Sequence, residues 1–146
     1  MNNSIEEMLQ RAEVKVSDER YNVISLSETV WSELQQHPEA SPRGTAPFAI
    51  FKDPWEITLI VDDADFMSVQ EFVVGAKVES GFCLLSFDLE LEFEAIGVIA
   101  AIANIFAEAE IPILSFSSFS RDHFLIKQTH IGKALRVLHG RIGSVC

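Results

Sequence analysis

Several short stretches of the sequence place reactive side chains close together. Asp62, Asp63 and Asp65 bring three carboxylates into four residues, a density that can bind a divalent cation. An EF-hand loop would also need a central glycine and a distal glutamate at fixed spacing, and this stretch has neither. We therefore expect these acids to lie where a strand ends and a short helix begins, because acidic side chains favour a helix N-terminus.

Nucleophilic catalysis needs a serine or cysteine beside an oriented base. Ser120 and His123 are near each other in the sequence, but no nucleophile elbow or oxyanion-hole motif accompanies them. Glu90 and Glu92 form a carboxylate pair on one face of an expected strand, without the pattern of a cleft. The sequence has no glycine-rich phosphate loop either, so we expect no enzyme and no cofactor.

Composition and charge narrow the class of protein further. The 146 residues carry 22 acids against 11 Lys and Arg, a net charge of −11 that argues against nucleic acid and anionic membranes as partners. The two cysteines and four histidines have no zinc-ligand spacing, so we expect no metal site and a reducing, cytoplasmic location. The acidic N-terminus does not resemble a signal peptide, and no apolar run reaches the about 20 residues of a membrane span.

The first half of the chain alternates between short strands and polar loops. Hydrophobic periodicity and turn residues predict strands or helical turns over these ranges: 13–16, 22–27, 29–36 (helical), 48–52, 56–61 and 73–79. Residues 37–47 hold three prolines and a glycine and are expected to form a loop. Residues 1–11 are expected to be a frayed helical turn or an arm.

The second half has clearer periodicity. Strict alternation predicts a half-buried strand over 85–94, and an apolar stripe predicts a helix that opens at Gly97. Two further strands, 111–116 and 123–127, precede a last helix over 129–138, with Thr129 as its N-cap and Gly140 as its stop. This order is β-α-β-β-α, and one more strand would complete the split βαββαβ unit of ferredoxin-like folds.

Two runs of residues in this half resemble a known family. Gly97-Val98-Ile99-Ala100-Ala101-Ile102, followed by Ala107-Glu108-Ala109-Glu110-Ile111-Pro112-Ile113, resembles the first helix and second strand of an ACT domain. The run from Ser115 to Lys127 resembles the serine/threonine–aromatic–aspartate turn of small bacterial tandem-ACT proteins, which are related to the ACT regions of aspartate kinases and to cytosolic arginine sensors.

The resemblance implies an α+β fold of two ACT-like units in tandem, each ferredoxin-like, with antiparallel sheets and helices on one face. The implied ranges are 1–11 for an N-terminal arm, 12–79 for a degenerate N-terminal unit and 80–146 for the C-terminal unit. ACT units bind amino acids where two units meet, so the implied function is a regulatory module that binds an amino acid or related small ligand.

The resemblance also implies which residues bind this ligand. Backbone N–H groups beside Gly97 would meet its carboxylate, since a residue without a side chain admits close approach to a helix N-terminus. Asp122 would accept hydrogen bonds from its cationic part. The candidate ligand-binding residues are Gly97, Ile96, Val98, Ser118, Phe119 and Asp122.

Other roles for the same residues stay open. Gly97 could instead permit tight packing, and Asp122 could cap backbone N–H groups of its turn. The chain as a whole could be a ligand-free module for protein interaction or homodimerisation, because its 11 Phe residues and exposed sheet edges suit such contacts. We expect a homodimer under either interpretation.

Overall fold

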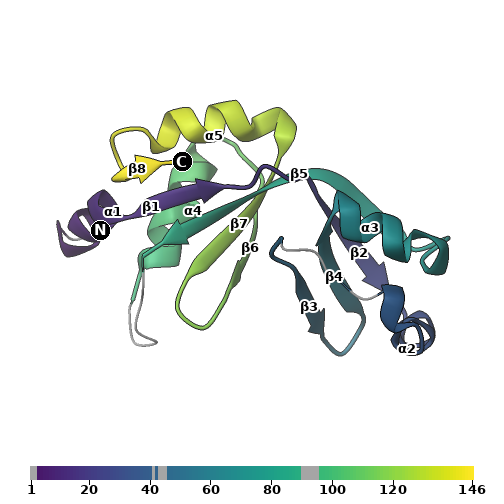
Figure 1. The fold of residues 1–146 in the computed structure, drawn as a ribbon. Coiled ribbons are helices and arrows are strands. Elements are labelled where there is room, and N and C mark those ends of the chain that lie inside the picture. Colours follow the sequence, from purple (N-terminus) through teal and green to yellow (C-terminus); the bar gives the residue numbers. More distant parts are fainter. Residues whose placement is uncertain (1–2, 41, 43–45, 90–95) are drawn as a thin grey trace. The chain divides into compact units, whose positions relative to one another are not determined.

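The computed structural model describes residues 3–40, 42, 46–89 and 96–146 (Figure 1). They form two compact units. Unit 1 combines Met1–Asp18 with Phe82–Cys146, and unit 2 comprises Glu19–Gly81. The N-terminal residues therefore group with the C-terminal part of the chain, although the sequence runs through unit 2 in between.

Unit 1 contains a five-stranded sheet in the order β6–β7–β5–β1–β8. Its elements are α1 (Asn3–Arg11), β1 (Glu13–Val16), β5 (Lys77–Asp88, which begins in unit 2), α4 (Val98–Glu108), β6 (Leu114–Ser117), β7 (Asp122–Lys127), a 3₁₀ turn (Gln128–His130), α5 (Ile131–Leu138) and β8 (Ser144–Val145). Neighbouring strands are antiparallel except β1 and β8, which are parallel. The sheet is therefore mixed, and the prediction of a purely antiparallel sheet was wrong because it missed β8.

Strand β1 fills the place that the sequence left open in the βαββα order of β5, α4, β6, β7 and α5. Val14 lies opposite Phe87, and Val16 lies opposite Leu85, so β1 occupies the edge of β5 that β7 leaves free. The α+β class is confirmed, and the fourth strand of this split βαββαβ unit comes from the N-terminus.

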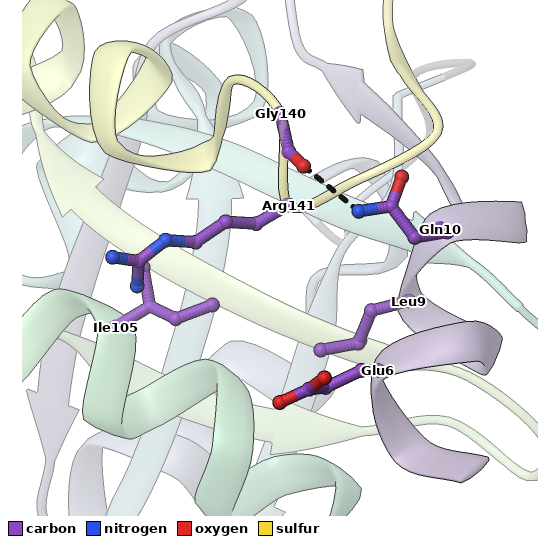
Figure 2. A pocket seen from close by; sticks show the side chains of 6 residues that line it. All are labelled: Glu6, Leu9, Gln10, Ile105, Gly140 and Arg141. Carbon is purple, nitrogen blue, oxygen red and sulfur yellow. Dashed lines mark hydrogen bonds between the residues drawn. The ribbon is translucent and has the colours of Figure 1, made fainter. Parts of the chain in front are cut away.

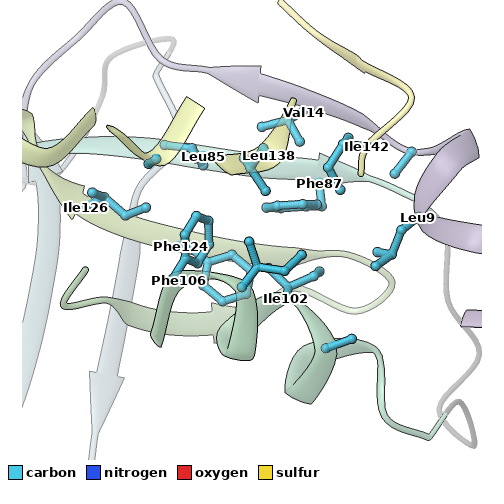
Figure 3. Packing of buried hydrophobic residues seen from close by; sticks show 14 of the residues in the cluster. Leu9, Val14, Leu85, Phe87, Ile102, Phe106, Phe124, Ile126, Leu138 and Ile142 are labelled. Carbon is cyan, nitrogen blue, oxygen red and sulfur yellow. The ribbon is translucent and has the colours of Figure 1, made fainter. Parts of the chain in front are cut away.

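The core of unit 1 lies between one face of this sheet and the helices α1, α4 and α5. In Figure 3, Phe87 and Phe124 of the strands meet Phe106 of α4, with ring centroids 5.4 and 5.7 Å apart for the two pairs that include Phe124. Leu9 of α1 and Leu138 of α5 are buried in the same cluster. Edge-to-face aromatic contacts of this kind add to the stabilisation from apolar burial.

Helix α1 and the C-terminal strand are held close to each other within unit 1. The backbone N–H of Gly143 donates to the carbonyl of Leu9 at 3.2 Å, and Ser144 donates to Ala12 at 3.2 Å. A side chain at position 143 would collide with the backbone carbonyl of Gln10. The glycine is therefore required by the close approach of the two chain segments.

Unit 2 repeats the order β-α-β-β-α and then contains the first residues of β5, so its strands are arranged β3–β4–β2–β5. Its elements are β2 (Tyr21–Leu26), α2 (Glu28–Gln35), a 3₁₀ turn (Pro38–Ala40), β3 (Ala49–Lys52), β4 (Ile57–Asp62), α3 (Asp63–Val69) and a second 3₁₀ turn (Gln70–Phe72). Alternate residues of β2 and β4, including Ile24 and Leu59, form its core with Leu34 of α2 and Val69 of α3.

The acids at the end of β4 begin a helix, as the sequence predicted. Asp62 is the N-cap of α3, and its Oδ1 accepts a hydrogen bond from the backbone N–H of Asp65 at 2.9 Å. Asp63 accepts from the side-chain amide of Asn22 at 2.9 Å. Both carboxylates therefore have local partners, and the described residues contain no group of three metal-ligating side chains.

Several element boundaries differ from the predictions, and β6 covers Leu114–Ser117 where a strand was expected over 111–116. A single strand, β5, runs over Lys77–Asp88 where separate strands were expected over 73–79 and 85–94, and residues 90–95 lie outside the described residues. Thr129 lies inside the 3₁₀ turn and does not cap a helix. His130 is the N-cap of α5, with no hydrogen bond from its side chain.

Because β1 pairs with β5, we expect this N-terminal strand to stabilise the C-terminal part of unit 1. Val14→Ala removes two fully buried methyl groups and should lower the free energy of unfolding of unit 1 by about 2 kcal/mol. Amide hydrogen exchange should then speed up in β7 and α5. Lys15→Ala, on the exposed face of the same strand, should change stability by less than about 0.5 kcal/mol. Equal effects of the two variants would contradict this assignment.

Candidate functional site

The N-terminus of α4 is shaped by Gly97. This residue is the N-cap, with φ 90° and ψ −3°, in the left-handed region that favours glycine. Its carbonyl accepts the first helical hydrogen bond, from Ala101 N at 2.9 Å. The N–H groups of the first helical turn have no partner within the helix and carry the positive end of its dipole, so an anion is stabilised there.

A side chain from α1 also lies against this glycine. A Cβ atom added at position 97 would come within 2.9 Å of Cδ1 of Ile5. Ile5 is partly buried against the core of unit 1. Gly97 therefore permits close packing of α1 on the start of α4.

Asp122 lies on the core face of the sheet, at the end where α4 begins. It is the first residue of β7 and lies opposite Phe87, near the end of β5 that leads towards α4 (Figure 1). Its side chain is buried, with only 5% of the residue exposed, and Oδ1 accepts a hydrogen bond from the Ser117 hydroxyl at 2.7 Å. Oδ2 is buried and has no hydrogen-bond partner among the described residues.

A buried carboxylate oxygen without a partner is unusual. Burying a charge without compensation costs several kcal/mol, and most buried polar atoms in native proteins have a partner. The Ser117 hydroxyl satisfies one oxygen only. The arrangement is therefore suited to a donor, such as an ammonium or guanidinium group, that would arrive with a ligand.

The other four predicted residues differ from one another in how exposed they are and in their hydrogen bonds. Ile96 and Phe119 are 87% and 82% exposed, and the Val98 side chain is buried in the core. Ser118 donates to the backbone carbonyl of Arg121 at 3.2 Å. Ser118 therefore belongs to its turn.

His123 connects this turn to the sheet face opposite the core. Its Nδ1 lies 2.9 Å from the Ser86 hydroxyl, its Nε2 lies 3.1 Å from the Ser118 hydroxyl, and its ring stacks on Phe116 at 5.4 Å. Burial lowers the pKa of His123 below its ordinary value, with Arg121 acting in the same direction and Asp122 opposing it. Ser120 accepts a hydrogen bond from Arg121 at 3.1 Å, so the structure pairs His123 with Ser86 and Ser118.

Sequence reasoning did not identify the partners of His123 and Arg121. The Nε of Arg121 donates a hydrogen bond to Asp88 at 2.8 Å. Alternation along the strands was the available signal, because it places Ser86 and Asp88 on the face opposite Phe87. The register between strands, which brings Ser86 beside His123, could not be read from either strand alone.

A separate pocket of about 280 Å³ lies between α1, α4 and the turn after α5 (Figure 2). Leu9 and Ile105 supply apolar surface, and Glu6 and Arg141 supply opposite charges. The side-chain amide of Gln10 donates to the carbonyl of Gly140 at 2.8 Å and ties α1 to this turn. These residues come from three distant parts of the chain, so no sequence motif marked them.

Comparisons with known proteins agree with this architecture. Residues 77–140 match the family model of the ACT domain. A comparison with curated protein sequences found no match. No described helix is both long and apolar enough to cross a membrane.

Solved structures of similar fold cover nearly the whole chain. A Vibrio cholerae protein described as a possible transport protein is 22% identical, with a TM-score of 0.69 over 94% of this chain and 95% of that chain. A protein from Agobacterium tumefaciens is 18% identical, with a TM-score of 0.69 over 93% and 92% of the two chains. The regulatory subunit of aspartate kinase from Thermus flavus is 12% identical, with a TM-score of 0.64 over 88% and 95%.

The fold is therefore that of ACT regulatory domains such as those of aspartate kinases. At these identities the similarity concerns architecture.

The conformation of Gly97 predicts a local cost of adding a side chain. Gly97→Ala should lower stability by about 1–2 kcal/mol, because an L-residue is strained at this φ and its Cβ crowds Ile5. Chemical denaturation measures the change. Gly132→Ala is the matched control: Gly132 lies within α5, where a Cβ would make only ordinary contacts, and alanine should stabilise the helix. Stabilisation at both positions would refute the strain argument.

The lowered pKa of His123 predicts a pH dependence of stability. The unfolded chain binds a proton at the ordinary pKa of 6.5, whereas the folded chain binds it only at lower pH. The contribution of His123 to stability should therefore decrease as the pH falls from about 7.5 to about 5.5. The loss should stay below about 1 kcal/mol, because the ring is only half-buried and solvent screens it.

Comparing melting curves of the wild type and His123→Gln at the two pH values isolates this contribution. Glutamine can keep hydrogen bonds to Ser86 and Ser118 but does not titrate. The wild type should lose more stability than His123→Gln on acidification, and His139→Gln, at an exposed position, should resemble the wild type. An unchanged slope in His123→Gln would count against the burial of a neutral ring.

Proposed function

We propose that this chain is a regulatory module that binds an amino acid or a related small ligand. The ligand carboxylate would meet the N–H groups at the start of α4, and its cationic group would meet Asp122. The proposal includes the expectation that the ligand lies where ACT units meet, that the chain acts as a homodimer in the cytoplasm, and that it catalyses no reaction itself.

The observation that carries this proposal is the buried Oδ2 of Asp122, which has no hydrogen-bond partner among the described residues. The same unit contains the N-terminus of α4 with Gly97 as its N-cap. An anion acceptor and a cation acceptor in one unit match the two charges of a zwitterion. The aspartate kinase regulatory subunits of similar fold support the class of function. They do not indicate which ligand this chain binds.

A thermal-shift screen against the twenty amino acids tests the proposal. A ligand at about 100 times its dissociation constant should stabilise the folded chain by roughly 2.7 kcal/mol, which corresponds to several degrees. Asp122→Asn should abolish the shift, because the amide keeps the shape and the Ser117 contact but not the charge. The ligand-free variant should be as stable as the wild type or more so, since the change removes a buried charge.

Asp53→Asn provides the matched control. Asp53 accepts hydrogen bonds from the backbone N–H groups of Trp55 and Glu56 in the β3–β4 hairpin of unit 2, so it caps a turn without a role in the proposed site. It should respond to ligand as the wild type does. A flat screen in the wild type, together with loss of stability in Asp122→Asn, would show that Asp122 is a structural residue of its turn.

A second candidate function, a ligand-free interaction module, rests on the β3–β4 hairpin of unit 2. Phe48, Phe51 and Trp55 are 50%, 66% and 85% exposed there, which is a large apolar surface for so short a segment. Light scattering at increasing concentration tests self-association through this hairpin. Assembly that persists in Trp55→Ser would argue against this surface.

A further inference from the structure

A row of polar side chains crosses the sheet of unit 1 on the face opposite its core. Lys15 of β1 lies opposite Ser86 of β5, and Ser86 lies opposite His123 of β7. Residues directly opposite each other on neighbouring strands project to the same side of a sheet. Val14, Phe87 and Phe124 alternate with this row and face the core, so the row belongs to the other face.

A groove of about 270 Å³ lies at this row, lined by Lys15, Ser86, Asp88 and Arg121. The Arg121 guanidinium is held in place by two hydrogen bonds, from Nε to Asp88 at 2.8 Å and from Nη1 to the Ser120 hydroxyl at 3.1 Å. The Arg121 guanidinium lowers the pKa of the Asp88 carboxyl through its hydrogen bond and its charge, with a smaller contribution from Lys15. The three charged groups therefore lie close enough to interact.

The charges in the groove favour an anion with a single negative charge. Lys15 and Arg121 contribute two positive charges and Asp88 one negative charge, which leaves one positive charge in a chain whose net charge is −11. Glu13 lies opposite Asp88 on the same face, does not line the groove, and accepts a hydrogen bond from the Cys146 thiol at 3.3 Å. A carboxylate carries one negative charge and so balances the one positive charge of the lining residues.

We propose that this groove is a second binding site that takes the carboxylate group of a small metabolite. Lys15 supplies a mobile ammonium group, Arg121 supplies a guanidinium already oriented by Asp88 and Ser120, and Ser86 supplies a hydroxyl. Charge-assisted hydrogen bonds from such donors are the stronger ones that bind carboxylates in proteins. Lys15 and Ser86 lie in strands, and Arg121 lies in the turn directly before β7. The donors are therefore held on or next to rigid elements.

The hydrogen bonds of His123 connect Ser86 to the adjoining turn. The Ser118 hydroxyl donates to the carbonyl of Arg121, so it accepts from Nε2–H of a neutral His123, and Nδ1 then accepts from the Ser86 hydroxyl. A carboxylate in the groove would compete for that hydroxyl proton. His123 is therefore a positioning residue for Ser86, and its own ring need not touch the ligand.

This site is distinct from the proposed amino-acid site. Asp122 and the start of α4 lie on the core face, whereas Lys15, Ser86 and His123 lie on the opposite face of the same strands. The two proposals can consequently fail separately. A change at Lys15 should leave the response that depends on Asp122 intact, and a change at Asp122 should leave this groove intact.

Nuclear magnetic resonance titration of the ¹⁵N-labelled full chain tests the second site. Sodium acetate should produce saturable shifts at the amides of Lys15, Ser86, Asp88 and Arg121, beyond those of sodium chloride at the same ionic strength. Lys15→Gln should weaken acetate binding roughly fivefold, because one charged donor is lost. Lys127→Gln is the matched control: it removes one positive charge from the same sheet face but at the other end of β7, where Lys127 lies over Phe82.

Each outcome decides between alternatives. Saturable acetate shifts that weaken in Lys15→Gln but persist in Lys127→Gln and in Asp122→Asn would support the site. Shifts that grow linearly with salt, or that weaken equally in both lysine variants, would show charge screening only and overturn it. Saturation by inorganic phosphate with no response to acetate would overturn the assignment to carboxylates.

Discussion

The pairing of β1 with β5 is the interaction on which unit 1 depends. Without β1, β5 would be an edge strand with unpaired backbone groups, and the core would lose Val14, which lies opposite Phe87. Strand β8 pairs with β1, and α1 leads directly into β1. The N-terminal segment therefore completes the sheet, covers the start of α4 through Ile5, and supplies Lys15 to the polar face.

Much of the fold could be predicted from local patterns, and the parts that could not depend on long-range pairing. Alternation over 85–94 and the stripe of Ile102 and Phe106 predicted a strand and a helix, and the structure contains β5 up to Asp88 and α4. The place of β1 could not be predicted, because four residues of alternating sequence do not specify their partner strand. The short β8 carries only two residues and has no periodicity to detect.

The candidate site was predictable in part for the same physical reason. Gly97 and Asp122 were predicted as ligand-binding residues, and the structure adds the left-handed conformation of Gly97 and the burial of Asp122. Ser118 was grouped with them by the family resemblance, and its hydroxyl lies 3.1 Å from Nε2 of His123. Ser86, Asp88 and Arg121 were not predicted to form a site. They come together through strand register, which the sequence alone does not give.

The origin of β1 at the N-terminus has a consequence for how the chain folds during synthesis. Strand β1 leaves the ribosome before all of unit 2, yet its partner β5 is complete only after residue 88 has been made. In unit 2 the strand pairs β2–β4 and β3–β4 join residues that are close in the sequence, so these pairs can form before β5 is complete and available to β1. Pairing Val14 with Phe87 then closes a loop of more than seventy residues, so unit 1 should be the slower to fold and the more exposed to mispairing.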